Sequence, residues 1–229
     1  MDPTAQPLVS LLPLLLRSIR RREAMPILEI CQWKVSKAFL EDPSSLGPAF
    51  DQVSAATGCH GVYSGLAEED KESVWLFIPW DTYEHHQTLI KDPSYPSLIE
   101  KLKPSFATNP KDLAMSHVDF NEDTTPGLTA PCTEVVKAVL KDGKTKTDLD
   151  AVMADVGSRI EAEKGSYPPV VWGPTIEDPN VFFLVVGWDS SKTHFDVVGQ
   201  ESFKIPLQNL RETADLHMVH VSFKKHPSS

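Results

Sequence analysis

The sequence predicts an α+β fold in which two tandem copies of one βαββαβ unit close into a single intramolecular barrel. The first observation is internal similarity: both halves carry a Trp-Asp pair followed by a histidine, and both end in D-L-x-M-x-H-V-x-F. The second is that the central strands, 74–78 and 181–186, lack the alternation of apolar and polar residues that is typical of a sheet with one solvent-exposed face. Because two helices cover only one face of a four-stranded sheet, we expect the other face to pack on the second sheet.

The halves superimpose without gaps over two windows. A shift of 108 positions places Trp80 on Trp188, and a shift of 103 places His117 on His220. The shift changes after residue 203, where a loop tolerates insertions and deletions. Duplication explains this pattern better than chance.

Periodicity predicts each element of the first half in turn. A strand-like segment is followed by a helix that ends at Gly58, and a polar turn then joins two strands into a hairpin. Asp81 and Glu84 form an acidic variant of the capping box at the start of the next helix. The predicted elements are a strand at 27–35, a helix at 46–57, strands at 62–66 and 74–78, a helix from residue 81 and a strand at 114–120.

The second half gives the same order of elements. Apolar residues recur at i, i+3, i+4 and i+7 within 147–163, which predicts an amphipathic helix, and Asp189 can cap the later helix. The predicted elements are a strand at 133–140, a helix at 147–163, strands at 170–173 and 181–186, a helix from residue 190 and a strand at 216–223. Each unit therefore has the ferredoxin-like order.

The predicted boundaries follow from the repeats. Residues 25–120 and 132–226 are the two repeats, and 121–131 has the composition of an exposed linker. Residues 1–24 are an extension whose apolar run is too short to cross a bilayer and precedes its arginines, which disfavours a secretory signal. The extension resembles a mitochondrial presequence in being rich in Arg, Leu and Ser, so a cytoplasmic location is expected with a mitochondrial one as the alternative.

Composition excludes several classes of partner. The chain of 229 residues has 22 Lys and Arg against 32 Asp and Glu, a formal net charge of −10, so neither nucleic acid nor a membrane is expected as a partner. The three cysteines, Cys31, Cys59 and Cys132, form no CxxC pair and predict neither a structural disulfide nor a zinc site. Further homodimerisation is left open.

The W-D-x4-H element, in a βαββαβ unit that ends in x-H-V-x-F, resembles the dimeric α+β barrel superfamily. The resemblance is greatest to antibiotic-biosynthesis-monooxygenase-like (ABM-like) domains of fungal proteins, and it covers nearly everything from residue 26. It implies a fold whose members include cofactor-independent quinol monooxygenases, polyketide cyclases, haem enzymes and stress-associated proteins. Cyclase-type members carry a histidine after the second helix, whereas the matching positions here are Tyr95 and Phe203, which puts a histidine-based cyclase mechanism in doubt.

Positions at which the repeats differ indicate where chemistry is retained. Tyr63 corresponds to Val171 and Tyr95 to Phe203, so the first half is the more polar one. We therefore predict that His86 is a general base, because a neutral imidazole accepts a proton near pH 7, and that the two phenols position the substrate.

The predicted substrate pocket also contains Trp80, His117, Trp172, His194 and His220. The alternative is structural: histidines kept in both halves can be hydrogen-bonded core residues, and the tryptophan before each helix can pack on its first turn. The four histidines could in principle bind a metal ion, but no H-x-H or HExxH motif supports a site, so neither a metal nor a cofactor is predicted. A haem needs one axial histidine, and no motif recommends one.

Two functions are consistent with these residues. The first is a small-molecule enzyme of secondary metabolism, a cofactor-independent monooxygenase or a cyclase, that acts on a hydrophobic, oxygenated or aromatic metabolite between helix and sheet. The second is a noncatalytic ligand-binding or stress-response module with the same fold. The enzyme is favoured, and an enclosed cavity next to His86 would support it.

Overall fold

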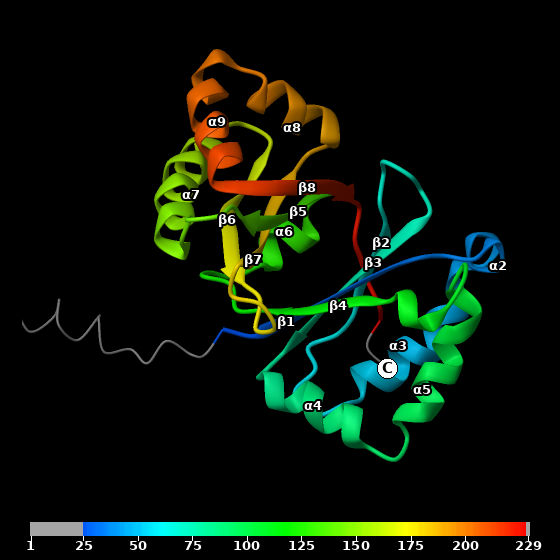
Figure 1. Cartoon of the computed structure of the whole chain (residues 1–229). Coiled ribbons are helices and arrows are strands. Elements are labelled where there is room, and N and C mark those ends of the chain that lie inside the picture. Colours follow the sequence, from blue (N-terminus) through cyan, green and yellow to red (C-terminus); the bar gives the residue numbers. More distant parts are fainter. Residues whose placement is uncertain (1–24, 228–229) are drawn as a thin grey trace, which may run out of the picture.

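The computed structural model describes residues 25–227, and its elements are labelled in Figure 1. The predicted targeting-like segment, 1–24, therefore lies outside the described residues. The strands are β1 (Ile27–Lys34), β2 (Tyr63–Leu66), β3 (Ser73–Trp80), β4 (Ala114–Val118), β5 (Cys132–Leu140), β6 (Ser166–Pro174), β7 (Val181–Trp188), β8 (Ala214–Val221) and β9 (Lys224–Lys225). The α-helices are α2 (Lys37–Glu41), α3 (Gly47–Ser54), α4 (Tyr83–Lys91), α5 (Tyr95–Leu102), α6 (Thr125–Thr129), α7 (Lys146–Glu161), α8 (Ser191–Val198) and α9 (Lys204–Thr213).

Each half folds into an antiparallel sheet with the same strand order. The first sheet runs β4-β1-β3-β2 and is extended by β9, and the second runs β6-β7-β5-β8. In both, the first and third strands of the unit lie in the centre and the second and fourth at the edges, which is the ferredoxin-like arrangement. The predicted α+β fold of two tandem ferredoxin-like repeats is confirmed.

The edge strands of one sheet meet those of the other. On one side Val118 of β4 pairs with Thr175 after β6, and the amide of Asn121 donates to the carbonyl of Trp172 at 3.1 Å. On the other side Ala67 after β2 pairs with Val221 of β8, and β9 continues across to pair with β2. Both junctions between the edge strands of the two sheets, called seams below, are bridged, so the two sheets enclose one interior.

Alternate residues of the central strands enter different cores. In β3, Trp75 and Phe77 belong to a cluster between the two sheets, whereas Leu76 and Ile78 belong to a cluster between the sheet and its helices. The second sheet divides in the same way, with Phe183 in the cluster between the sheets. Both faces of the central strands are buried, as their apolar sequences require. In Figure 1 helices α3, α4 and α5 cover the outer face of the first sheet, and α7, α8 and α9 cover that of the second.

Several local predictions need correction. The helix starts are one residue later than expected: Thr82 rather than Asp81 is the N-cap of α4, and Ser190 rather than Asp189 caps α8 with its hydroxyl. Neither α5 nor α9 was predicted, because their apolar periodicity is short and each contains a proline near its start, a position that proline tolerates.

The predicted linker is not simply exposed. Residues 125–129 form α6, whose Leu128 is buried in the cluster between the sheets. Thr133 of β5 donates its hydroxyl hydrogen bond to the carbonyl of Gly127, so the crossover is anchored to the second sheet.

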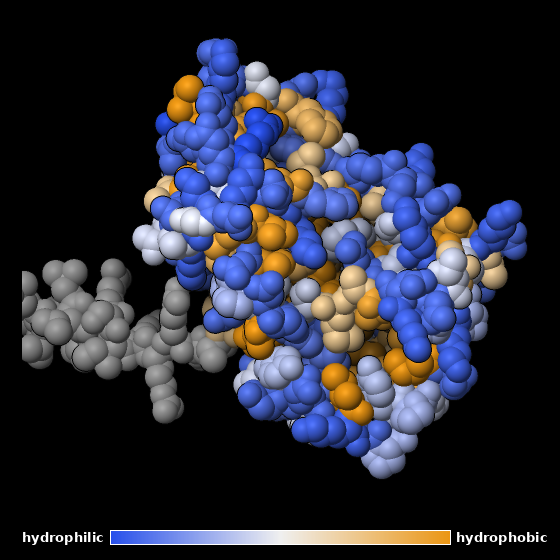
Figure 2. All heavy atoms as spheres, viewed as in Figure 1, coloured by the Kyte–Doolittle hydropathy of each residue, from blue (hydrophilic) through white to orange (hydrophobic). Residues whose placement is uncertain are grey.

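None of the helices between residues 25 and 227 combines the length and apolar character that crossing a bilayer requires. On the face shown in Figure 2 the surface is mostly hydrophilic, and hydrophobic residues are visible in scattered patches between the elements.

Two equivalent glycines allow the seams to close. A Cβ on Gly173 of β6 would lie 2.1 Å from the carbonyl oxygen of Asp119, and a Cβ on Gly65 of β2 would lie 2.8 Å from that of Ser222. Both clashes are with backbone of the opposite half, which a side-chain rotation cannot relieve. The two positions superimpose in the repeat alignment, so close approach at the seam explains a glycine in both halves.

We expect Gly173→Ala to lower the free energy of unfolding by about 1–3 kcal/mol, because the added methyl group must push the seam apart. Urea unfolding monitored by tryptophan fluorescence measures the change. Gly47→Ala is the matched control, since its Cβ would meet nothing within 4 Å. Equal stability of the two variants would contradict the close approach at this seam.

Candidate functional site

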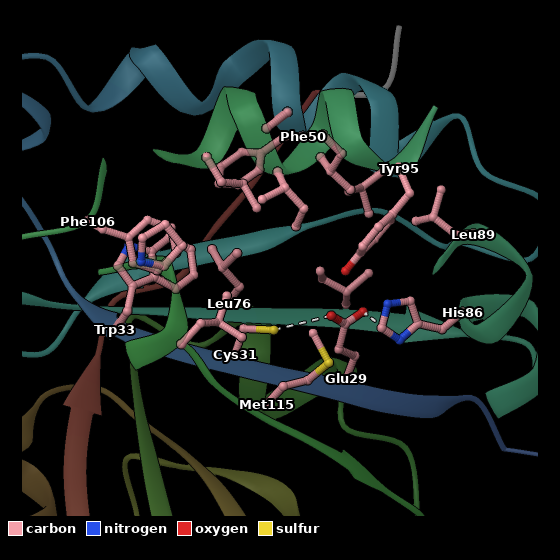
Figure 3. Close-up of a pocket in the computed structure, with 18 of the residues that line it drawn as sticks. Glu29, Cys31, Trp33, Phe50, Leu76, His86, Leu89, Tyr95, Phe106 and Met115 are labelled. Atoms are coloured by element: carbon pink, nitrogen blue, oxygen red, sulfur yellow. Dashed lines mark hydrogen bonds and ion pairs between the residues drawn. The ribbon is translucent and has the colours of Figure 1, made fainter. Parts of the chain in front are cut away.

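A cavity of about 210 Å³ lies between the outer face of the first sheet and helices α3, α4 and α5 (Figure 3). Its walls are mainly apolar and include Trp33, Phe50 and Phe106. Three of its polar residues gather at one end, where Figure 3 shows the hydroxyl of Tyr95 pointing toward Glu29 and His86. A mainly apolar pocket with a few convergent polar groups is the usual form of a small-molecule site.

Glu29 is the acid at this end of the cavity. It lies on β1 and is only 4% exposed. One carboxylate oxygen accepts a hydrogen bond from Nε1 of Trp80 at 2.8 Å and the other accepts one from Sγ of Cys31 at 3.2 Å. A buried carboxylate without such donors would be strongly destabilising, so its neighbours hold it in place.

His86 connects this acid to a second histidine. Its Nδ1 lies 3.5 Å from the nearer Glu29 oxygen and 2.6 Å from Nε2 of His117. His117 on β4 in turn contacts Glu177, with 2.5 Å between its Nδ1 and the carboxylate, and its backbone N–H donates to the same carboxylate. Glu177 belongs to the turn between β6 and β7, so the opposite half completes the group.

Burial determines how these groups ionise. It lowers the pKa of His86, an effect that the nearby Glu29 carboxylate opposes and the His117 ring reinforces. Burial, together with the charge of Glu29, raises the pKa of Tyr95 and raises that of Cys31 well above its usual value. Near neutral pH the imidazole is therefore an uncharged base, while the phenol and the thiol keep their protons.

The second half repeats the arrangement. Glu134 on β5 accepts from Nε1 of Trp188 at 2.9 Å and lies 3.5 Å from Nε2 of His194. Nδ1 of His194 is 2.8 Å from Nε2 of His220, whose Nδ1 is 2.7 Å from Glu69 in the turn between β2 and β3. These groups lie beside a cavity of about 320 Å³, which Glu134 and His194 line.

The sequence-predicted residues fall into three groups. His86 and Tyr95 line the first cavity and His194 lines the second. His117 and His220 are buried behind those histidines and hydrogen-bonded to them.

The remaining predicted residues do not line either cavity. Trp80 stacks on His86, with 5.1 Å between ring centroids, and so supports the imidazole from behind. Trp172 packs on the second helix–sheet core and donates to Asp150. The prediction that Tyr63 shares a pocket with His86 is wrong, because its position on β2 directs it into the cluster between the sheets.

Sequence reasoning missed Glu29 and Glu134. Each is the one acidic residue of a central strand, at the third residue of both β1 and β5, and an acid in the same place in both repeats was the available signal. It also missed the roles of Glu69 and Glu177, although the Glu-Asp pair that contains them superimposes in the two halves.

The first cluster has residue types that could bind a metal ion. Glu29, His86 and His117 bring three donor atoms within 4.8 Å of one another. The two ring nitrogens, however, are 2.6 Å apart, a hydrogen-bond distance, whereas two ligands of one tetrahedral zinc ion would lie roughly 3.3 Å apart. The structure thus joins these atoms to each other, and the predicted lack of a metal site stays a prediction.

We expect stability to decrease as the pH falls below about 6.5, the ordinary value for histidine. Burial lowers the pKa of both His86 and His194, so in this range the unfolded chain binds more protons than the folded chain. Urea unfolding between pH 7.5 and 5.5 measures the slope, and the double variant His86→Gln/His194→Gln should reduce it. His217→Gln removes an exposed histidine as the control. A slope that the double variant leaves unchanged would refute this assignment.

No family model and no curated protein matches the sequence. Solved structures do match, over both halves. A candidate monooxygenase from Fusobacterium nucleatum has a TM-score of 0.63 at 15% identity, covering 89% of this chain and 94% of that one. A candidate monooxygenase from Lactobacillus acidophilus gives 0.59 at 13%, covering 87% and 94%. An anthrone oxidase-like protein gives 0.63 at 12%, covering 89% and 94%.

At these identities the likeness concerns the fold. Because the matches extend across both repeats, they agree with the barrel built from one polypeptide. The chain has the dimeric α+β barrel fold, with both sheets supplied by a single chain.

Proposed function

We propose that the first cavity is the active site of a cofactor-independent monooxygenase that acts on a small, oxygenated aromatic metabolite. The observation that carries this proposal is the pairing of an uncharged buried imidazole, His86, with a buried acid, Glu29, at the polar end of an apolar cavity. Such a pair can remove a proton from a bound phenol and stabilise the resulting charge without solvent.

The size and walls of the cavity define the substrate class. Its volume of about 210 Å³ is below the ~300–1,000 Å³ that is typical of drug-sized ligands, which favours one or two aromatic rings. Phe50 and Phe106 offer flat apolar contacts, and the Tyr95 hydroxyl can donate to a substrate oxygen. We therefore propose a hydroquinone-type substrate.

Each side chain then has a defined role. With Nδ1 of His86 occupied by His117, Nε2 is the ring nitrogen that takes the phenolic proton, and Glu29 stabilises the imidazolium. The electron-rich phenolate reacts directly with molecular oxygen at the adjacent ring carbon. One oxygen atom stays on the ring, and the other leaves as water with the two hydrogens that the substrate loses.

The electrons balance without a further reductant. For a naphthohydroquinone the products are a hydroxynaphthoquinone and water, and the substrate supplies all the electrons that reduce oxygen. The similar solved structures include candidate monooxygenases and an anthrone oxidase-like protein, which supports oxygen-dependent chemistry on this fold. The protein supplies proton transfer, orientation and exclusion of water.

We expect His86→Gln to lower the turnover number by about 10²–10⁴-fold, because the amide cannot accept the proton. Tyr95→Phe should mainly raise KM, since it removes a hydrogen-bond donor and keeps the ring. Oxygen uptake with 1,4-dihydroxynaphthalene, and incorporation of one atom from ¹⁸O₂ into the quinone, measure the reaction.

Tyr63→Phe is the matched control, because it removes a buried phenol that lies outside the cavity and should leave turnover unchanged. Saturable binding of 1,4-dihydroxynaphthalene without oxygen uptake by the wild-type chain would instead support the noncatalytic binding module. Oxygen uptake that survives His86→Gln would refute the assigned base.

A further inference from the structure

Both clusters of buried acids and histidines extend from a cavity to the surface. Glu29 and His86 line the first cavity, His117 is buried, and the side chain of Glu177 at the far end is 42% exposed. Every neighbour along this row is within hydrogen-bond distance except the first, where Glu29 lies 3.5 Å from the His86 ring. The row therefore runs from the cavity to a solvent-exposed carboxylate.

The second row has the same order and the same ends. Glu134 and His194 line the second cavity, His220 is buried, and the side chain of Glu69 is 41% exposed. Here Glu134 contacts Nε2 of His194 and His220 contacts its Nδ1, so the row passes through the ring.

The contacts between the paired histidines constrain their protons. Two imidazole nitrogens that are 2.6 Å or 2.8 Å apart share one proton, because two N–H groups would repel and two lone pairs would leave no bond. The carboxylate at the outer end accepts from Nδ1 of its histidine and so selects the tautomer whose Nε2 faces the other ring. This arrangement is suited to a stepwise transfer in which each ring accepts at one nitrogen and releases at the other.

The outer carboxylates come from the opposite halves. Glu177 lies in the turn between β6 and β7 and contacts His117 of the first half, while Glu69 lies in the turn between β2 and β3 and contacts His220 of the second. Each carboxylate also accepts the backbone N–H of its histidine. The hairpin turns are thus held at the ends of the rows by two bonds each.

We propose that each cavity is an acid–base site with a proton path that leaves through a carboxylate of the opposite half. The first path is His86, His117 and Glu177, with Glu29 beside Nδ1 of His86, and the second is Glu134, His194, His220 and Glu69. The second cavity is accordingly a second acid–base site. The first path rests on the proposed function, because it carries the proton that His86 takes from the substrate.

Proton transfer along the first path is balanced and reversible. When Nε2 of His86 takes the substrate proton, its Nδ1 proton passes to Nε2 of His117, and the Nδ1 proton of His117 passes to Glu177. The return of the proton along the same path supplies the departing water and restores both tautomers. Glu177 passes the proton to solvent and takes one back from it.

The two histidine pairs have different charged and titratable neighbours. Besides Glu29 and Glu177, the groups that face the His86–His117 pair are Tyr95, Cys31 and the ring of Tyr83, which packs edge-on against His117. Around the His194–His220 pair these groups are Glu134 and Glu69. Arg211 lines the same cavity, and Cys132 and Glu68 lie close to the two acids. Within each row, the carboxylate at the outer end is exposed and the one at the cavity is buried.

The experiment measures exchange of the buried imidazole protons with water, by NMR of the full chain labelled with ¹⁵N-histidine. Glu177→Gln keeps a hydrogen-bond acceptor for His117 but removes the proton-accepting group. We expect it to slow exchange of the His86–His117 proton by at least about tenfold and to leave the His194–His220 proton unchanged. Glu69→Gln should do the reverse.

Asp178→Asn is the matched control, because it removes the same charge from the adjacent residue, whose carboxylate accepts only the backbone N–H of Asn180. It should leave both exchange rates unchanged. Thermal unfolding checks that each variant is folded, and if Glu177→Gln is not, Glu177→Asp moves the carboxylate back by one methylene and should slow exchange by a smaller factor. Equal exchange rates in the Glu177 and Asp178 variants would overturn the path.

A second measurement separates this proposal from the proposed function. In oxygen uptake, Glu177→Gln should lower the turnover number at low buffer concentration, and added formate should restore it. If the wild-type chain consumes no oxygen but Glu177→Gln slows proton exchange, the monooxygenase proposal fails and the path stands. If Glu177→Gln has normal turnover and an unchanged rate of proton exchange, the proposed path is refuted and the monooxygenase proposal stands.

Discussion

The face-to-face packing of the two sheets is the constraint on which the rest of the structure depends. Trp75 and Phe77 in one sheet and Phe183 in the other are almost fully buried between the sheets, so neither sheet can stand alone without exposing them. Because the opposite face of each sheet is covered by its own helices, the two halves can bury all four faces only together. The chain achieves this by closing both seams, which requires Gly65 and Gly173.

Closure of the seams also brings the acids of one half into contact with the histidines of the other. Where β4 meets the end of β6, the turn that follows β6 brings Glu177 onto His117, and the equivalent seam brings Glu69 onto His220. The fold therefore places an acid of one half on a histidine of the other without any additional element. In the His86–His117 pair, three of the four ring nitrogens are engaged by the other ring or by Glu177, which offsets part of the loss of hydration that burial imposes.

The sequence was sufficient for the fold because its signals are local or repeated. The apolar central strands, the duplicated motif and the turn residues all predict the same two units, whereas α5 and α9 gave too few periodic residues to be recognised. The site was only partly predictable. His86 and His117 were found as repeated residues, but their contact depends on how a helix packs on a strand, and Glu177 is 60 residues from His117 in the chain.

Tyr63 shows why the face of a strand matters more than its position in the sequence. The difference between Tyr63 and Val171 is real, but it lies on the face that packs against the other sheet, one residue out of phase with the cavity.

The two halves share the buried cluster of acids and histidines and differ in the residues that α5 and α9 contribute to the cavities. Each sheet provides an acid on its first strand, a tryptophan at the end of its third and a histidine on its fourth. The helices differ: α5 places Tyr95 in the first cavity, whereas α9 places Arg211 in the second, which is the larger by volume. The equivalent helix histidines, His86 and His194, agree as well, because each hydrogen-bonds the histidine on the last strand of its own half. The helix residues without such a contact differ, so the two cavities present a phenol and a guanidinium, respectively, beside similar clusters of acids and histidines.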